Sequence, residues 1–419
     1  MSAGSTRLYF GWWVLAAVFV GEMFAIGSTS YAFGLFVVPA GEAYGASRGT
    51  LNTGLILFLL GMGLSAPFIG RLLDRYPARW VMGVGTLAMA AGFVGVGLAP
   101  TLQISAFCIL LLIGPGAAAI GPLAANTLVT RWFIRHRGKA LGLAAVATSL
   151  GGVAVVPLMA WNLDRFGWRM ALVLQGAIIL VVVGALVLWR IRSRPQDLGL
   201  TPPADAGTVS AVQSRQWTVG ELVRTRDFWF IAFSVGLIFG INQSVLASLV
   251  PYATDAGIGL AQATLLVSAL SVCSILGKLL FGAVADRYDK RRLLLVPVAC
   301  TLLQLVTLVS EPSFPVLLVI CGLAGFAIGG ELPVWAALVG ERFGQVSFGT
   351  AMGLMSPVNT VIGLLAIGFV GGAFDTSGSY AMPFTVLSGF VVLSGVLTLL
   401  ISRPPQAETS ISTPASAAG

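Results

Sequence analysis

The sequence predicts an all-α integral membrane protein with twelve transmembrane helices in two six-helix bundles. Three observations support this prediction: the composition, the number of long apolar runs, and an internal repeat. Of all residues, 57% are hydrophobic and only 10% are charged, with a mean hydropathy of +0.93. Soluble domains carry about 25% charged residues. A chain of 419 residues with so few charges could not cover a water-exposed surface, so we expect its exterior to face lipid.

The apolar runs are long enough to cross a bilayer, which requires about 20 residues of helix. Twelve such runs are found, at approximately 11–38, 50–72, 79–99, 104–130, 139–161, 169–190, 227–253, 260–284, 292–311, 315–341, 348–373 and 380–402. The 52 glycines are spread through these runs. Because small residues let membrane helices approach closely, they favour a compact bundle.

The basic residues predict which side of the membrane each loop occupies. With the N-terminus placed inside, twenty of the 24 Lys and Arg residues lie on the inner side, and only Arg48, Arg165 and Arg169 lie on the outer side. Loops rich in Lys and Arg remain in the cytoplasm. We therefore expect a multi-pass protein of the cell inner (plasma) membrane with both termini in the cytoplasm.

Polar segments divide the chain into parts. The longest polar stretch is rich in Pro, Arg, Asp, Thr and Ser and falls between the sixth and seventh apolar runs, as a linker between two halves would. The final segment, "PPQAETSISTPASAAG", is typical of a disordered tail. The expected parts are an N-terminal bundle at 1–190, a cytoplasmic linker at 191–226, a C-terminal bundle at 227–403 and a cytoplasmic tail at 404–419.

The cysteines and the single histidine indicate neither catalysis nor metal binding. Cys108, Cys273, Cys300 and Cys321 all lie in apolar runs without a CxxC spacing, and His136 lies in a basic loop. We expect no enzyme, no cofactor and no metal site. The net charge of +8 reflects loop topology, so no nucleic-acid partner is expected.

Two pairs of segments repeat along the chain. "GRLLDRYPARW" at 70–80 matches "GAVADRYDKRR" at 282–292, and "RGKALGLAA" at 137–145 matches "FGTAMGLMS" at 348–356. The offsets, from 70 to 282 and from 137 to 348, are nearly equal. A duplicated six-helix unit is therefore expected, and parallel repeats of six helices are the internal symmetry of major facilitator transporters.

The first repeated pair has the form G-x-x-x-D-R. It resembles the signature loop of the major facilitator superfamily, between the second and third helix of each half. The resemblance implies that the glycine permits close helix contact, that the aspartate faces a helix N-terminus, and that aspartate and arginine form a charge network at the cytoplasmic seam. The matching residues are Gly70, Asp74, Arg75, Gly282, Asp286 and Arg287. The alternative is that they are topology-setting charges in a solvated turn.

A narrower resemblance covers nearly the whole chain. The segment "RWFIRHRGKALGLAAVA" at 131–147 resembles the fifth-helix signature of the monocarboxylate transporter family, and "FGWWV" at 10–14 resembles its other signature. "RPQDLGL" at 194–200, "TRDFWFI" at 225–231 and "VPYATDAGI" at 250–258 resemble segments of bacterial relatives such as the oxalate:formate antiporters. This resemblance implies a carrier that moves a small monocarboxylate, such as lactate, pyruvate or formate, by alternating access.

The same resemblance directs attention to Lys278, four residues before Gly282. The family places an arginine there that binds the substrate carboxylate, and lysine keeps the charge but loses the bidentate fork. The chain departs from mammalian members by having Leu35 where they have a first-helix lysine, and Ser274 where they have an eighth-helix aspartate. No Lys or Arg occurs in 348–373, which argues against a dicarboxylate.

Three charged residues lie within the predicted spans, away from their ends: Glu22, Lys278 and Glu331. Such charges are costly in a bilayer, so each is a functional hypothesis. Lys278 is the candidate carboxylate ligand, with snorkelling toward the cytoplasm as the alternative. Glu331 and Glu22 are candidates for proton coupling. Glu331 could pair with Lys278 or face a polar helix contact, and Glu22 could make a structural hydrogen bond.

Five further polar or aromatic residues are candidates for a central substrate cavity: Tyr31, Asn242, Gln243, Trp335 and Asn359. Each could equally hold neighbouring helices together. We expect a monomer whose partners are lipid, a small carboxylate and, if transport is proton-coupled, protons. Exchange of one substrate for another is the other mode considered. The alternatives are a major facilitator carrier for another small organic compound, including drug efflux, and a transporter-like sensor.

Overall fold

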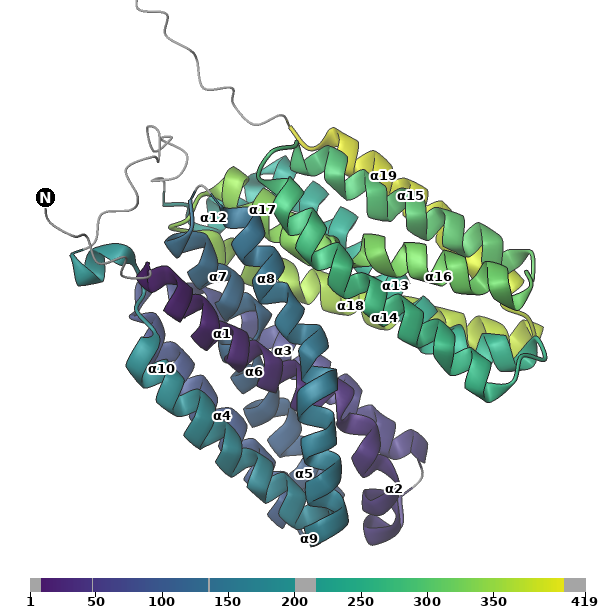
Figure 1. Cartoon of the computed structure of the whole chain (residues 1–419), viewed down its shortest axis with the longest axis horizontal. Coiled ribbons are helices and arrows are strands. Elements are labelled where there is room, and N and C mark those ends of the chain that lie inside the picture. The colour runs from purple at the N-terminus through teal and green to yellow at the C-terminus, as the bar shows by residue number, and fades with distance from the viewer. Residues whose placement is uncertain (1–8, 47, 135, 200–215, 403–419) are drawn as a thin grey trace, which may run out of the picture.

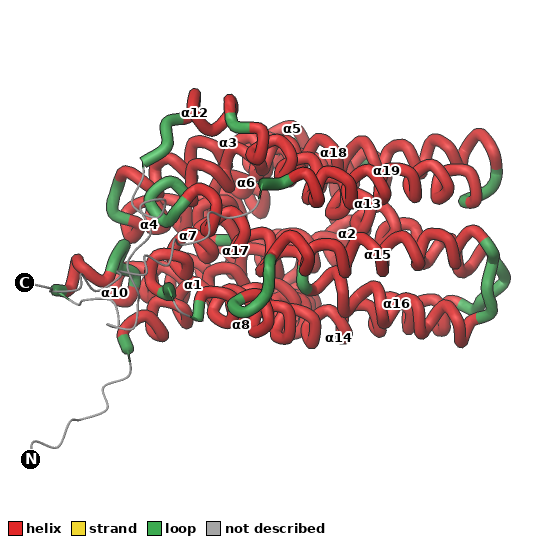
Figure 2. Tube along the Cα trace, turned by 90° about the horizontal axis from the view of Figure 1, so that it is seen from above, coloured by secondary structure: helices red, strands yellow, loops and turns green. Residues whose placement is uncertain are grey.

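The computed structural model describes residues 9–46, 48–134, 136–199 and 216–402. The described chain consists of helices and connecting loops, as Figure 2 shows. The predicted tail at 404–419 and the central part of the predicted linker, 200–215, lie outside the described residues.

The N-terminal half contains helices that are interrupted by short π-helical turns. Its elements are α1 (Phe10–Ile26), η1 (Gly27–Tyr31), α2 (Phe33–Tyr44), α3 (Arg48–Arg75), α4 (Ala78–Leu98), α5 (Leu102–Cys108), η2 (Ile109–Ile113), α6 (Gly114–Ile120), α7 (Pro122–Trp132), α8 (Arg137–Leu150), η3 (Gly151–Val155), α9 (Val156–Ile178), η4 (Ile179–Val183) and α10 (Gly184–Arg190). π-Helical turns inside α-helices are often found at functional sites.

The C-terminal half has longer uninterrupted helices. Two short helices belong to the linker, η5 (Pro195–Leu198) and α12 (Val219–Arg224). They are followed by α13 (Arg226–Asp255), α14 (Leu260–Ala285), α15 (Lys290–Val309), α16 (Phe314–Gly329), α17 (Glu331–Phe343), α18 (Phe348–Ser377) and α19 (Ala381–Leu400).

Within the described residues, eleven stretches are long and apolar enough to cross a membrane, and one of them covers 54 residues, Arg137–Arg190. A helix of that length would extend about 80 Å, more than twice the thickness of a bilayer core. Gly167 breaks it, with φ 75° and ψ 166°. The two sides of this break correspond to the predicted fifth and sixth spans. The all-α membrane fold predicted from the sequence is confirmed.

The two halves form separate bundles that meet at one end. In Figure 1 the purple-to-teal and the green-to-yellow bundles lie close near α7, α8 and α17 and diverge toward the other end. Contacts between halves are made by α3 with α18 and by α8 with α14 and α17. The start of α1, the end of α10 and α12 lie toward this joined end. The joined end is therefore the side that the sequence assigns to the cytoplasm.

The break at Gly167 leads to a test of stability. The φ and ψ of Gly167 fall in a region that residues with a Cβ adopt at a cost of about 1–3 kcal/mol. We expect Gly167→Ala to lower the melting temperature of the detergent-solubilised protein. Gly368→Ala is the matched control, because a Cβ at Gly368 meets nothing within 4 Å. Equal melting temperatures for the two variants would contradict the proposed strain.

Candidate functional site

Lys278 joins the two halves near the middle of the membrane-spanning helices. Its Nζ atom donates hydrogen bonds to Thr148 Oγ1 and Ser149 Oγ, each at 2.6 Å. Lys278 lies on α14 of the C-terminal half, whereas both hydroxyls lie on α8 of the N-terminal half. The ammonium group is therefore held by hydroxyl groups across the interface, so it is not extended toward the cytoplasmic loop as the snorkelling alternative expected.

Two other predicted residues lie beside this contact. The Tyr31 hydroxyl interacts with Ser149, and the Glu22 carboxylate interacts electrostatically with Lys278. Glu22 is 1% exposed, and neither carboxylate oxygen has a hydrogen-bond partner among the described residues. We call Glu22, Tyr31, Thr148, Ser149 and Lys278 the central cluster. The cluster combines one cation, one buried carboxyl group and three hydroxyl groups between the halves.

Thr148 and Ser149 were not among the residues predicted from the sequence. They are adjacent hydroxyl residues that directly follow the quoted fifth-helix segment, in the same alanine-rich helix α8. That pair was the available signal, but a sequence cannot show that both face the opposite half.

Glu331 belongs to a second polar cluster, inside the C-terminal half. Asn242 Nδ2 donates to Glu331 Oε1 at 2.5 Å, and Thr301 donates to Asn242 Oδ1 at 2.9 Å. Glu331 is the first residue of α17, directly after Gly330, and is 3% exposed. Its hydrogen-bonded partner is therefore Asn242, and the pairing with Lys278 considered from the sequence is not the one observed.

The remaining predicted residues occupy different environments. Trp335 lies one helical turn after Glu331 and is 9% exposed. Asn359 is also 9% exposed, and its side chain lies against Gly236 of α13. Gln243 is exposed although its neighbour Asn242 is buried, because successive helical residues point about 100° apart. These residues lie on α13, α17 and α18, which Figure 1 shows in the C-terminal bundle.

The first copy of the repeated loop contacts a helix of the opposite half. Asp74 accepts hydrogen bonds from the Thr350 amide at 2.6 Å, the Thr350 hydroxyl at 2.7 Å and the Gly349 amide at 3.3 Å. It also forms an ion pair with Arg131 at 2.5 Å. Asp74 therefore binds the free N–H groups at the start of α18, where the helix dipole favours a negative charge.

The second copy makes the reciprocal contact. Asp286 accepts hydrogen bonds from the amides of Gly138, at 2.6 Å, and Lys139, at 3.2 Å, at the start of α8. The two helix starts that the aspartates bind are the second pair of repeated segments, 137–145 and 348–356. Each half thus places its loop aspartate on the corresponding helix of the other half.

The loop glycines permit this close approach. A Cβ atom on Gly282 would lie 2.6 Å from the Cα atom of Gly142, and one on Gly70 would overlap the carbonyl oxygen of Gly349. Any larger residue would force α14 away from α8, or α3 away from α18.

The loop arginines differ from the expectation. Arg75 and Arg287 are exposed, and the arginine that binds Asp74 is Arg131 at the end of α7. The reason is geometric: when Asp74 faces the seam, the next residue is rotated by about 100° and faces away. Arg131 lies in the quoted segment 131–147. Because it is 57 residues from Asp74 in the sequence, its pairing with Asp74 could not be predicted from the sequence.

The other half does not reproduce the Arg131 pair. Arg342 occupies the position equivalent to Arg131 in the repeat, and it pairs with Asp227 at the start of α13. Asp227 also accepts hydrogen bonds from the Ser402 amide and hydroxyl, each at 3.1 Å. The second loop aspartate instead interacts electrostatically with Arg137, a buried residue of α8.

Comparison with known protein families agrees with this architecture. The family model described as Major Facilitator Superfamily matches residues 18–251 and 232–418. The chain belongs to the major facilitator superfamily. Its members carry small molecules through membranes, and the fold, the duplicated loops and the apolar helices all fit this assignment.

Relatives confirm the narrower resemblance. Human monocarboxylate transporter 11 is 31% identical over 403 residues, covering 92% of this chain and 82% of the relative. The uncharacterized MFS-type transporter YcxA of Bacillus subtilis (strain 168) is 25% identical over 402 residues, covering 93% and 94%. The resemblance to monocarboxylate transporters is confirmed, and these relatives are transporters, not enzymes.

Two solved structures share the fold. The crystal structure of the human organic anion transporter MFSD10 (TETRAN) superimposes with a TM-score of 0.68 at 18% identity, covering 93% of this chain and 99% of that chain. The proton:xylose symporter XylE gives a TM-score of 0.69 at 15% identity, covering 94% and 96%. At these identities the likeness establishes the fold.

The unequal contacts of the two loop aspartates predict unequal effects of mutation. Asp74→Ala removes an ion pair whose side chains are 4% and 8% exposed and leaves Arg131 buried, which costs about 3–5 kcal/mol in comparable pairs. We expect it to lower the melting temperature more than Asp286→Ala, which removes two amide contacts and an electrostatic interaction with Arg137, because Arg137 also interacts with Glu341. The exposed Asp375 provides the control variant Asp375→Ala. A smaller shift for Asp74→Ala than for Asp286→Ala would refute the ranking.

Proposed function

We propose that the protein transports a small monocarboxylate across the membrane by alternating access, with Lys278 as the carboxylate ligand. The observation that carries the proposal is the position of the Lys278 ammonium group, hydrogen-bonded to Thr148 and Ser149 of the opposite half. An anion that binds this cation contacts both halves at once, as substrate recognition at the interface of repeats requires.

The environment of Lys278 suits reversible binding. Its hydrogen-bonded partners are hydroxyl groups, which can donate to an incoming carboxylate as well as accept from the lysine. Tyr31 lies at the same place and offers a third hydroxyl group and an aromatic surface. A single lysine gives one point of charge without a bidentate fork. The cluster is therefore matched to one carboxylate on a small organic group.

The relatives support this substrate class. The monocarboxylate transporters named 11 and 13 are among them, and one structural neighbour is titled an organic anion transporter. Trp335, Asn242, Gln243 and Asn359 remain candidate contacts for the organic part of the substrate.

The seam at the joined end supports a gating role for the repeated loops. In this conformation Asp74 and Asp286 hold α18 and α8, and the bundles diverge toward the opposite end. We propose that these contacts break when the carrier opens to the cytoplasm. From the charge bias of the loops we further propose that both termini lie in the cytoplasm of a protein of the cell inner (plasma) membrane, with the domain boundaries as predicted above.

Proton coupling is assigned to Glu22 first and to Glu331 second. Glu22 is buried, without a hydrogen-bond partner among the described residues, and interacts electrostatically with Lys278. Protonation of Glu22 removes the negative charge that competes with a substrate anion for Lys278. Glu331 shares its carboxylate with Asn242 inside one half, so it is less directly linked to the interface.

The role of Lys278 is tested by uptake of labelled lactate, pyruvate, formate and acetate into proteoliposomes. Because a hydrogen bond to a charged group contributes about 1.5–3 kcal/mol, Lys278→Ala should raise the half-saturating concentration at least tenfold. Lys278→Arg should retain measurable uptake. Asp375→Ala, at an exposed position outside the proposed binding site, is the control. Normal monocarboxylate uptake by Lys278→Ala would refute the proposal and favour a carrier for neutral or amphipathic compounds.

The coupling residue is tested in the same vesicles with and without a pH gradient. We expect Glu22→Gln to lose the stimulation by the gradient while keeping exchange of substrate at equal pH, because its side chain can no longer gain and lose a proton. Glu331→Gln should keep the stimulation, since its amide can still accept from Asn242. The opposite pattern would transfer the coupling role to Glu331.

A further inference from the structure

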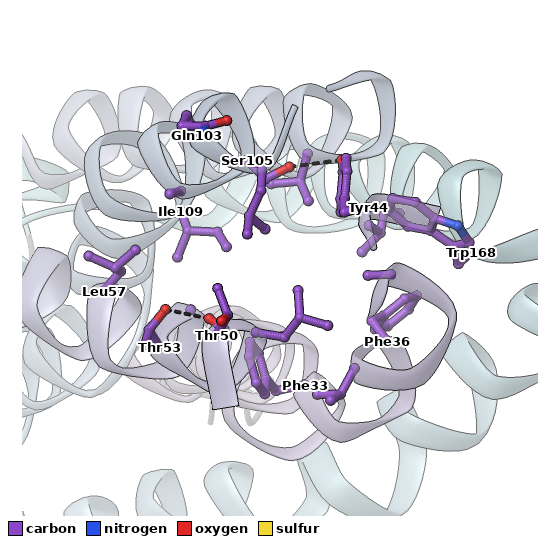
Figure 3. Close-up of a pocket in the computed structure, with 18 residues that line it drawn as sticks. Phe33, Phe36, Tyr44, Thr50, Thr53, Leu57, Gln103, Ser105, Ile109 and Trp168 are labelled. Carbon is purple, nitrogen blue, oxygen red and sulfur yellow. Dashed lines mark hydrogen bonds between the residues drawn. The ribbon is translucent and has the colours of Figure 1, made fainter. Parts of the chain in front are cut away.

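A cavity unrelated to Lys278 lies inside the N-terminal bundle. It has a volume of about 260 Å³ and is lined from α2, α3, α4, α5, η2 and α9, with no lining residue from the C-terminal half. Figure 3 shows side chains from facing helices pointing toward one another across it. It lies at the end of the bundle opposite the repeated loops, where the helices near Gly45 and Gly167 turn.

The interior of this cavity is apolar. Phe33, Phe36, Leu57 and Ile109 lie around it, and none of its 18 lining residues is charged. Three of the polar side chains that reach it, those of Tyr44, Thr53 and Ser105, are already bonded to protein. The Tyr44 hydroxyl contacts the Ala99 carbonyl at 3.0 Å and Ser105 at 3.1 Å. A molecule in this space therefore gains contact with hydrocarbon surfaces.

One end of the cavity carries a fixed cation. The Arg169 guanidinium lies 4.5 Å from the centroid of Trp168 and 5.5 Å from that of Tyr44, two lining residues that Figure 3 shows together at one end. Arg169 Nη1 donates to the carbonyl oxygens of Gly97, at 3.3 Å, and Ala99, at 2.7 Å. Because a guanidinium has five N–H donors, these two bonds leave others for an anion.

An apolar cavity with a cation at one end is suited to binding an amphiphilic molecule at the membrane interface. Tyr and Trp favour the headgroup level of a bilayer, and a guanidinium there can form charge-assisted hydrogen bonds to the phosphate of a lipid headgroup. We propose that the cavity binds one acyl chain of an anionic phospholipid, with its headgroup at Arg169. The occupant is a lipid because the bilayer surrounds this bundle, and an anionic lipid because the cation at the rim matches its charge. The proposal is independent of the transported substrate.

The test uses purified full-length protein and native mass spectrometry with phosphatidylglycerol or phosphatidylcholine of identical chains. We expect the protein to retain phosphatidylglycerol more strongly. Arg169→Gln should weaken that binding about fivefold, since one basic residue near an anionic headgroup contributes about 1 kcal/mol. Arg169→Lys should keep the preference. Arg165→Gln removes an equal charge beside Trp161, away from the cavity, and should have no effect.

Filling the cavity gives a second, independent variant. Ala106 lines it, so Ala106→Phe should abolish the bound lipid, whereas Ala91→Phe on the exposed side of α4 should not. Bromine-labelled phosphatidylglycerol should also quench the fluorescence of Trp168, measured as the difference from Trp168→Phe. Equal retention of both lipids, unchanged binding by Ala106→Phe, or binding of free oleate without phospholipid would each overturn the proposal.

Discussion

The free N–H groups at the start of a helix need acceptors, and this requirement joins the two halves of the protein. Within a bilayer, or near its edge, unpaired backbone groups are costly. The starts of α18 and α8 meet this need with carboxylates from the opposite half, Asp74 and Asp286. The seam is therefore held by polar contacts that can be exchanged for water, which suits an interface that has to open.

The glycines of the repeated loops make those contacts possible. Without the close approach at Gly70 and Gly282, the aspartates could not reach the amides of the facing helices. The duplication is nevertheless not exact in its charges. Asp74 has Arg131 as a buried ion partner, whereas the equivalent arginine of the other half, Arg342, pairs with Asp227. The first loop is thus anchored within its own half, and the second depends more on the opposite half.

In the central cluster, too, polar groups of one half satisfy a charged group of the other half. Lys278 satisfies its ammonium group with hydroxyls of the facing half, and the buried Glu22 compensates part of its charge from α1. Such an arrangement holds a cation without a tight ion pair. The interface thus has charge at its centre and removable contacts at its end, and both features are used by the alternating access that we propose.

The sequence by itself determined the membrane fold, the duplication, the transporter family and the loop residues Gly70, Asp74, Gly282 and Asp286. The membrane fold and the duplication follow from composition, run length and repetition along the chain. The family and the loop residues were indicated by the resemblance of short motifs to those of known transporters. Only the tertiary structure decided that Arg131 and not Arg75 binds Asp74, that Lys278 is held by Thr148 and Ser149, and that Glu331 is bonded to Asn242. Each of these depends on the rotation of one helix against another that is distant in the chain. A helical face repeats every 3.6 residues, so the pattern shows which residues share a face but not which helix that face meets.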